Sequence, residues 1–412
     1  MHSLQARDRQ TTKDFAFCFA RYSYGAEVEY INVNYSPSNI EFDCVDIGIL
    51  TYELMSFRST PYWGEIEPII LRIAKNCKKV LVFIQDDYAA NSITESFVLK
   101  LNKFTQVVVY TPIKFDYPLI YPRLYQDIEI KYCHTGYVEE SHLDKILHYS
   151  KPFDQRDYDY ANRVSKLPIW LGEQAQLKYH VSKRVAQEFR NNGAIVDDSS
   201  EAVDVKAGIE WFRFLGNARY TSGSLGGSSI TDPKMCLSRR GNRIEQKTGE
   251  MSYAKLLKIK RESSKIGNFA TIGPRLFEAA MMGTCQILVE SEYIDGFEPG
   301  RDYLPIKSNF NNLEETISEL MRDQDLGAEI ARNAFETLIS SGKHTYEKFV
   351  REIGASDPIS KSAPKVEVIS LERQLHLKQD EIFNLDMHDN QSKRRIKART
   401  TMISNFTEPF LL

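Results

Sequence analysis

The residues best placed for chemistry are Arg275 and Glu278, which lie three positions apart in the stretch GPRLFEAAMMG at residues 273–283. Pro274 suits the first turn of a helix, and Gly283 can end that helix in the left-handed conformation. Arg275 would then lie in the first turn, where unpaired N–H groups favour an anion, and its guanidinium could bind a phosphate. Glu278 would share a helix face with Arg275 and could accept hydrogen bonds from ribose hydroxyls. An ordinary ion pair between the two side chains explains the spacing equally well.

A second candidate group lies in the first half of the chain, where Asp86 and Asp87 follow an apolar run at residues 80–85. If this run is a parallel strand, both carboxylates lie at its carboxyl end, where open α/β sheets bind ligands. A carboxylate there could act as a base toward an acceptor hydroxyl. The alternative is that one of the two caps a helix that starts near residue 89.

The elements that must position these residues alternate between apolar, β-rich runs and amphipathic stretches. Near-continuous apolar runs of this length fit a parallel sheet that is covered on both faces. The resulting β-α-β alternation predicts an open α/β sheet. The predicted strands cover residues 15–20, 28–33, 45–51, 80–85 and 106–110, and the predicted helices cover residues 65–76 and 89–101.

The second half repeats the alternation after a polar segment at residues 151–163, which we interpret as a linker. The pattern predicts strands at residues 194–196 and 285–289, and helices at residues 176–192, 211–215, 311–321 and 326–341. We therefore expect an α/β domain over residues 1–150, a second one over residues 151–355, and a tail over residues 356–412. The tail has a predicted helix at residues 369–385 and a basic run at residues 393–399, and it is interpreted as solvated or as a linker to more protein.

Composition excludes several classes of function. The 412 residues suit two domains, and 42% hydrophobic with 26% charged residues is typical of a soluble globular protein. A net charge of −3 gives no global attraction to nucleic acid. The six cysteines are isolated, which argues against a disulfide framework and against a zinc site. No apolar run approaches the ~20 residues of a membrane helix, so we expect a cytoplasmic protein.

Three motifs in a fixed order resemble the C-terminal half of GT-B glycosyltransferases. They are RxFEAxxxG at residues 275–283, FEPGRDY at residues 297–303 and HTY at residues 344–346. Two further segments, KLPIWLGE at residues 166–173 and GSLGGSSITD at residues 223–232, are similar to a bacterial subgroup that acts on surface polysaccharides. The resemblance covers about residues 15–353. It implies two Rossmann-like domains that face each other across a cleft.

This resemblance implies a nucleotide-sugar donor bound by the second half of the chain. It assigns Glu278 to the ribose and Arg275 or Lys178 to the diphosphate. Gly227 and Ser228 lie in a Gly/Ser loop that could bring backbone N–H groups to phosphate or sugar. An ordinary surface turn and an ordinary solvated lysine are the alternatives for the loop and for Lys178.

The resemblance also implies transfer of a sugar to a glycan or lipid-linked glycan in polysaccharide biosynthesis, without a metal ion, another cofactor or nucleic acid. The candidate catalytic residues are Asp86 and His134, although His134 in CHTGY could equally be a packed structural histidine. Ala270 stands where many retaining members have Glu, and Leu225 stands where the subgroup often has an acidic residue. Retention or inversion therefore stays open. So do two alternatives, an inactive scaffold subunit and a sugar-nucleotide epimerase. Association with the inner face of the membrane, and with further domains or copies through the tail, are the other expected contacts.

Overall fold

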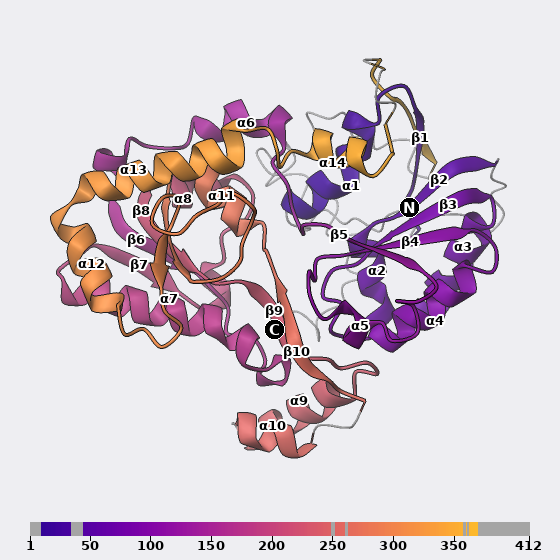
Figure 1. The fold of residues 1–412 in the computed structure, drawn as a ribbon, viewed down its shortest axis with the longest axis horizontal. Helices are drawn as coiled ribbons and strands as arrows, with labels where there is room; N and C mark the ends of the chain where they lie inside the picture. The colour runs from indigo at the N-terminus through magenta and orange to yellow at the C-terminus, as the bar shows by residue number, and fades with distance from the viewer. Residues whose placement is uncertain are drawn as a thin grey trace. The chain divides into compact units, whose positions relative to one another are not determined.

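The computed structural model describes residues 10–33, 44–248, 252–259, 263–356, 360 and 362–369. Its helices and strands form two parallel sheets with covering helices (Figure 1), which confirms the expected α/β class with two Rossmann-like sheets. Among the described residues, no helix combines the length and the apolar character that crossing a membrane requires. The helix predicted from residue 369 onward and the basic run at residues 393–399 lie outside the described residues, apart from residue 369 itself. The predicted domain boundaries stay predictions.

The first sheet consists of four parallel strands that follow one another in chain order. Its central strands read as apolar runs because both faces are covered, and Val80, Leu81 and Val82 have no exposed surface. The strands are β2 (Val45–Leu50), β3 (Cys77–Phe83), β4 (Gln106–Thr111) and β5 (Glu129–Tyr132). The helices of this part are α2 (Tyr52–Ser56), α3 (Trp63–Ala74), α4 (Asn91–Leu101) and α5 (Tyr117–Ile120).

The strand predicted at residues 15–20 is wrong, because these residues belong to helix α1 (Gln10–Tyr22). Phe15 and Phe19 lie one turn apart on its buried face, and the Phe15 ring lies 5.2 Å from Phe83 and 5.9 Å from Phe349. A short apolar run does not distinguish a buried helix from a strand by its period. Phe349 belongs to α14 (Tyr346–Glu352), so this late segment packs on the core of the first sheet. Strand β1 (Glu27–Ile31) pairs in parallel with β13 (Lys365–Ile369), so part of the predicted tail is a strand.

The second sheet has five parallel strands in the spatial order β12, β11, β8, β6 and β7. The polar segment predicted as a linker is wrong in its second half, because it contains the inner strand β6. The polar side chains of β6 are satisfied inside the fold: Asp159 pairs with Arg219, and the Tyr160 hydroxyl lies 2.7 Å from Ser222 Oγ. The strands are β6 (Tyr158–Arg163), β7 (Val196–Ser199), β8 (Ala218–Gly223), β11 (Cys285–Val289) and β12 (Leu304–Ile306).

The strand order of the second sheet reverses between β6 and β8. The chain runs outward from β6 to β7 and then returns to the other side of β6 for β8, β11 and β12. Such a switch point is where open α/β sheets form ligand crevices, outside the carboxyl ends of the strands. The helices of this part are α6 (Glu140–Leu147), α7 (Glu173–Asn191), α8 (Ile209–Gly216), α11 (Arg275–Met281), α12 (Leu313–Arg322) and α13 (Gln324–Phe335), which continues as a π-helical turn (Glu336–Ser340).

An insertion between β8 and α11 forms an antiparallel hairpin of β9 (Gly226–Ile230) and β10 (Ile266–Thr271). The expected flexible Gly/Ser loop is therefore largely a strand. Helices α9 (Cys236–Thr248) and α10 (Tyr253–Ile259) lie between the two strands in sequence and at the far end of the hairpin in space (Figure 1). The start of the insertion contacts the loop after β3, where Asp232 N donates to Tyr88 O at 2.6 Å and Ala90 N donates to Asp232 O at 3.1 Å.

Candidate functional site

A hollow with about 400 Å³ of empty space lies at the carboxyl ends of β8 and β11, next to the switch point of the second sheet. Residues from β8, from β11, from the segment that leads into α11 and from α7 form its walls. Among these described lining residues there is no Asp or Glu, whereas two are cationic. They are Lys178, Thr221, Ser222, Gly223, Ser224, Leu225, Ile272, Gly273, Arg275, Leu276, Gln286, Leu288 and Tyr293.

Arg275 is held in this first hollow by two neighbours. Its Nη1 donates to Asn162 Oδ1 at 3.1 Å, and its guanidinium carbon lies 4.8 Å from the ring centroid of Trp211. Asn162 is fully buried at the end of β6 and donates through Nδ2 to Ser222 O at 2.9 Å. The guanidinium is thus ordered by a fixed amide on one side and by an aromatic face on the other, an arrangement that favours the charged group.

Lys178 of α7 lines the same hollow as Arg275, so the structure brings these two predicted site residues together. A Cβ atom on Gly226 would lie 4.0 Å from Lys178 Nζ, which shows how closely the first strand of the hairpin approaches the ammonium group. Two cations without an acidic lining residue make the first hollow suited to an anion such as a phosphate.

Glu278 points to a different place from Arg275. Its Oε2 accepts a hydrogen bond from Trp211 Nε1 at 2.8 Å, and it lines a second hollow together with Phe212 and Pro274. The two residues of the helical pair therefore contact the same indole, one at its ring face and one at its N–H. The ribose contact expected for Glu278 stays a prediction, and the described contacts give it the role of orienting Trp211.

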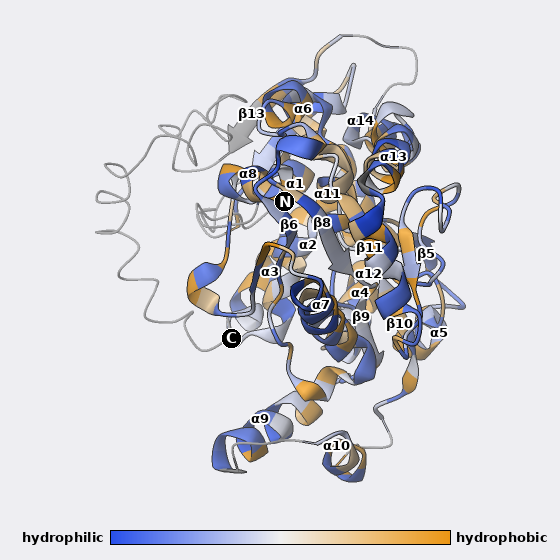
Figure 2. Ribbon diagram, turned by 90° about the vertical axis from the view of Figure 1, so that its left-hand side faces the viewer, coloured by the Kyte–Doolittle hydropathy of each residue, from blue (hydrophilic) through white to orange (hydrophobic). Residues whose placement is uncertain are grey.

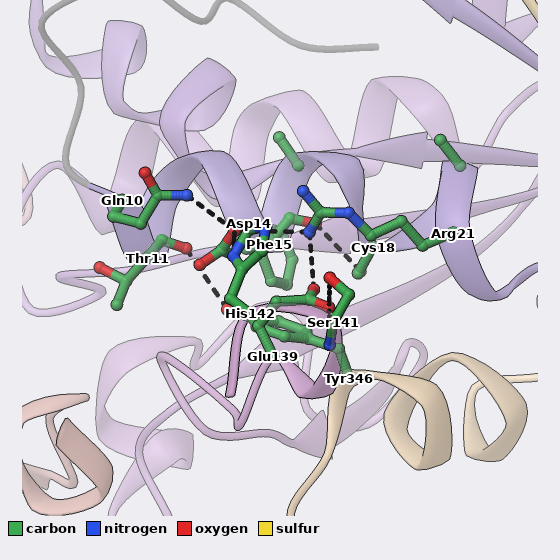
Figure 3. A network of polar contacts seen from close by, with 12 residues as sticks. Gln10, Thr11, Asp14, Phe15, Cys18, Arg21, Glu139, Ser141, His142 and Tyr346 are labelled. Carbon is green, nitrogen blue, oxygen red and sulfur yellow. Dashed lines mark hydrogen bonds and ion pairs between the residues drawn. The ribbon is translucent and has the colours of Figure 1, made fainter. Parts of the chain in front are cut away.

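The second hollow is bordered by a buried polar network between α1 and α6 (Figure 3). Arg21 Nη1 lies 2.6 Å from Glu139 Oε2 and 3.4 Å from Asp14 Oδ1, and His142 Nδ1 lies 3.5 Å from the same Asp14 oxygen. Burial, and to a smaller degree Glu139, raises the pKa of Asp14 to about 7 despite the nearby Arg21. One guanidinium cannot fully compensate two buried carboxylates, so this network stabilises a protonated Asp14 and ties the two helices together.

Gly227 and Ser228 lie in β9 and do not line the first hollow. Gly227 has φ +92°, and a Cβ atom there would lie 2.1 Å from Phe269 O, so the pairing with β10 requires glycine. Ser228 is fully buried and donates through Oγ to Leu171 O at 2.6 Å. The described contacts thus explain both residues by the structure of the hairpin, and their donor-binding role stays a prediction.

Asp86 lies beyond the end of β3, at the edge of the first sheet where the sequence places it. It is exposed, has φ +57° and accepts a hydrogen bond from the Tyr88 hydroxyl at 2.6 Å. Asp87 is fully buried, and burial raises its pKa to about 6 although Arg58 favours its charged form. The capping alternative is wrong, because the N-cap of α4 is Ala90 and no side chain caps it. The role of Asp86 as a base stays a prediction.

His134 is packed between aromatic rings, where it lines neither hollow. Its ring centroid lies 6.0 Å from Phe277 of α11 and 6.0 Å from His344, and its Nδ1 lies 3.1 Å from the Tyr132 hydroxyl. Burial and, to a smaller degree, His344 lower the pKa of His134 to about 4, so the ring is neutral at pH 7. The neighbouring Thr135 donates to Ile272 O at 2.8 Å, which fixes this loop beside the segment leading into α11.

Two residues of the site were not singled out from the sequence. Asn162 was hidden in a segment that looked like a linker, and Trp211 was noted only as part of a helix. An indicator for Asn162 is its place at the end of a strand next to the switch point. Trp211 gives no local indication, since its partner Glu278 is 67 positions away. Among the described residues, no group of three or more His, Cys, Asp or Glu side chains could hold a metal ion.

Residues 242–355 match the model of a family described as glycosyl transferase-like. This match confirms the resemblance predicted for the C-terminal part of the chain, including α11 and the first-hollow residues Ile272, Gly273, Arg275, Leu276, Gln286, Leu288 and Tyr293. No curated protein matches the chain.

Several solved structures are similar to the chain over most of its length. HepE from Anabaena in complex with UDP and glucose has a TM-score of 0.39 and 10% identity, with 72% of this chain and 82% of that chain covered. A GtfA/B complex has a TM-score of 0.39 and 11% identity, with 76% and 57% covered. Sucrose-phosphate synthase from Thermosynechococcus elongatus has a TM-score of 0.35 and 10% identity, with 71% and 77% covered. A TM-score below 0.5 does not establish a common fold, so the two-sheet architecture rests on the strand pairing of this chain.

Proposed function

We propose that this chain, whose residues 242–355 match a glycosyl transferase-like family, is a glycosyltransferase that binds the diphosphate of a nucleotide sugar in the first hollow. The observation that carries the proposal is the convergence of Arg275 and Lys178 on one hollow at the switch point of the second sheet. The hollow lies where open α/β sheets bind ligands, and its charge suits a diphosphate.

The two cations would act on the charge that builds up on the leaving diphosphate. A planar guanidinium can donate two parallel hydrogen bonds to phosphate oxygens, and an ammonium group adds a compact positive charge. Asn162 and Trp211 hold the Arg275 guanidinium in place before any ligand arrives. Donors that are ordered in advance stabilise a transition state without reorganisation during the reaction.

The acceptor is the finer part of the proposal. A glycan or lipid-linked glycan hydroxyl would be the nucleophile, as in polysaccharide biosynthesis, with Asp86 or His134 as the base. Asp86 is exposed at the carboxyl edge of the first sheet, and a neutral His134 can accept a proton at pH 7. Stabilisation of the leaving group by Arg275 and Lys178 would make a bound metal ion unnecessary for that step.

A panel of nucleotide sugars that includes UDP-glucose tests the proposal by thermal shift and by donor turnover. A donor that binds the native state should raise the melting temperature, and transfer or slow hydrolysis should release the nucleotide. Arg275→Ala and Lys178→Ala should each lower kcat/KM by about 10²–10³-fold, as the loss of one transition-state donor does elsewhere. The matched control is Arg190→Ala, an exposed cation at the end of α7. Unchanged kinetics in both site variants would contradict the assignment.

A second candidate function, a binding subunit without catalysis, is favoured by Ala270. This residue lies in β10 opposite Gly227 and offers no carboxylate where many retaining glycosyltransferases have one. Such a subunit would bind nucleotide sugars through Arg275 and Lys178 but would release no nucleotide, with or without an acceptor. The two functions are therefore separated by turnover in a sample that shows a donor-dependent thermal shift.

A further inference from the structure

The insertion between β9 and β10 has a charge that sets it apart from the rest of the chain. Residues 234–265 include ten Lys or Arg and three Asp or Glu, whereas the whole chain has a net charge of −3. Eight of the ten basic residues are described, and each is exposed. They are Lys234, Arg239, Arg240, Arg243, Lys247, Lys255, Lys258 and Lys265, and we call them the basic face of the insertion.

The basic face is on the outer side of α9 and α10 because the opposite side is packed. Leu237 and Leu256 are buried in a small apolar cluster that includes Trp170, and Gly241 of α9 approaches the Trp170 ring to about the distance of van der Waals contact. Arg239, Arg243 and Lys247 follow at intervals of four along α9, which places them on one helix face. Figure 2 shows α9 mainly in the hydrophilic colour.

Within the described part of the chain, no ion pair joins the basic face to a carboxylate, in contrast to the paired cations elsewhere on the surface such as Lys78 with Asp46. Like charges at this density repel one another, and an anionic partner would relieve that repulsion. A cluster of this size on a helix surface is typical of proteins that bind anionic lipid headgroups.

We propose that the basic face binds the surface of an anionic lipid bilayer. Two apolar side chains beside it favour a bilayer over a nucleic acid. Leu257 lies between Lys255 and Lys258 and is 41% exposed, and Ile266 follows Lys265 and is 54% exposed. An exposed leucine among lysines inserts at the boundary between headgroups and acyl chains. Single-stranded nucleic acid sites use exposed aromatic side chains for stacking, and the described residues of α9 and α10 include none.

Vesicle flotation of the full chain tests this inference, with vesicles of phosphatidylcholine alone and vesicles that contain about one third phosphatidylglycerol. The chain should float with the anionic vesicles only, and about 1 M salt, where the Debye length is about 3 Å, should release it. A variant with five neutralised positions should bind anionic vesicles at least about tenfold more weakly. Its substitutions are Arg239→Gln, Arg240→Gln, Arg243→Gln, Lys255→Gln and Lys258→Gln.

A control variant neutralises five exposed cations outside the insertion and should float like the unchanged chain. Its substitutions are Lys103→Gln, Arg190→Gln, Lys307→Gln, Arg322→Gln and Lys343→Gln. A second variant, Leu257→Ser, keeps every charge and should weaken vesicle binding severalfold, by the loss of one inserted side chain. Circular dichroism of each variant shows whether it is folded.

Three outcomes would overturn the inference. They are equal flotation of the five-position variant and its control, no flotation of the unchanged chain at low salt, and binding to single-stranded RNA without binding to anionic vesicles. The readout is binding and not sugar transfer, so a failure here leaves the proposed function untouched, and the reverse also holds.

Discussion

The two parallel sheets differ in what their carboxyl ends offer to a ligand. In the first sheet the described strands follow one another in chain order, and Arg58 fills the loop after β3 by donating through Nη2 to the carbonyls of Gln85, Asp86 and Ala89 at 3.1–3.3 Å. In the second sheet the strand order reverses, and Arg275 lines a hollow at the switch point. The comparison teaches that a guanidinium at a sheet edge can be part of the architecture or part of a binding site, depending on whether the strands beside it diverge.

The largest expected effect separates these two arginines by stability. Arg58→Met should lower the free energy of unfolding by about 3–5 kcal/mol at pH 7, because it leaves the buried carboxylate of Asp87 and three loop carbonyls without their partner. Arg275→Met should lower it by no more than about 1 kcal/mol, since one hydrogen bond to Asn162 and the contact with Trp211 are lost. Urea denaturation of both variants measures the contrast, and similar losses would remove the distinction between the two sheet edges.

Gly227→Ala tests whether the glycine beside the second sheet serves the hairpin or a ligand. A Cβ atom 2.1 Å from Phe269 O cannot be accommodated at φ +92°, so β9 and β10 must separate locally. We expect a loss of about 3 kcal/mol in the free energy of unfolding. Gly193→Ala is the matched control, with φ +76° and open space around its Cβ position, and should cost about 1 kcal/mol. Equal losses would show that the left-handed conformation alone matters and that the contact with Phe269 does not.

His134 predicts a pH dependence that originates beside the first sheet. Its pKa falls from 6.5 in the unfolded chain to about 4 in the folded protein, so the unfolded state binds more protons between these values. Stability should therefore be lost as the pH falls from about 6.5 to about 4, and His134→Gln should remove about 2 kcal/mol of that loss. Asp14 has a raised pKa and acts in the opposite direction in both proteins, so the difference between them isolates His134. Parallel curves of melting temperature against pH would contradict the prediction.

The smallest effect concerns the support of Arg275. Asn162→Ala removes the acceptor at 3.1 Å and leaves the guanidinium ordered only by Trp211 and its remaining contacts. Donor turnover should fall about tenfold in kcat/KM, a loss of about 1.4 kcal/mol. Because Asn162 is fully buried, the variant is compared at a temperature at which circular dichroism shows it folded. A loss as large as that of Arg275→Ala would mean that Asn162 itself contacts the donor.

Local patterns predicted those elements whose ends are marked in the sequence. Helix α11 begins one residue after Pro274, and Gly283 follows its end with φ +59°, close to the predicted bounds. Strand β11 matches its prediction because an apolar run of five between turn residues has no other reading in an α/β alternation. The buried positions of β11 carry no polar side chain that needs a distant partner, except Gln286, which donates to Leu276 O.

The elements and contacts that the sequence did not reveal depend on distant partners. Strand β6 looked polar because Asp159 is satisfied by Arg219, 60 positions away. The separation of Glu278 from the first hollow depends on Trp211, which follows from the packing of α8 and not from the spacing within α11. Family resemblance placed Arg275 and Lys178 together correctly as lining residues of one hollow, but it could not indicate how Arg275 is held.

The most direct test of the central claim is a calorimetric titration of UDP into the unchanged chain, Arg275→Met, Lys178→Met and Asp86→Ala. We expect the two variants at the second sheet to lose at least about tenfold in affinity, and Asp86→Ala, at the edge of the first sheet, to bind UDP as the unchanged chain does. Loss of UDP binding in Asp86→Ala together with unchanged binding in Arg275→Met and Lys178→Met would contradict the account.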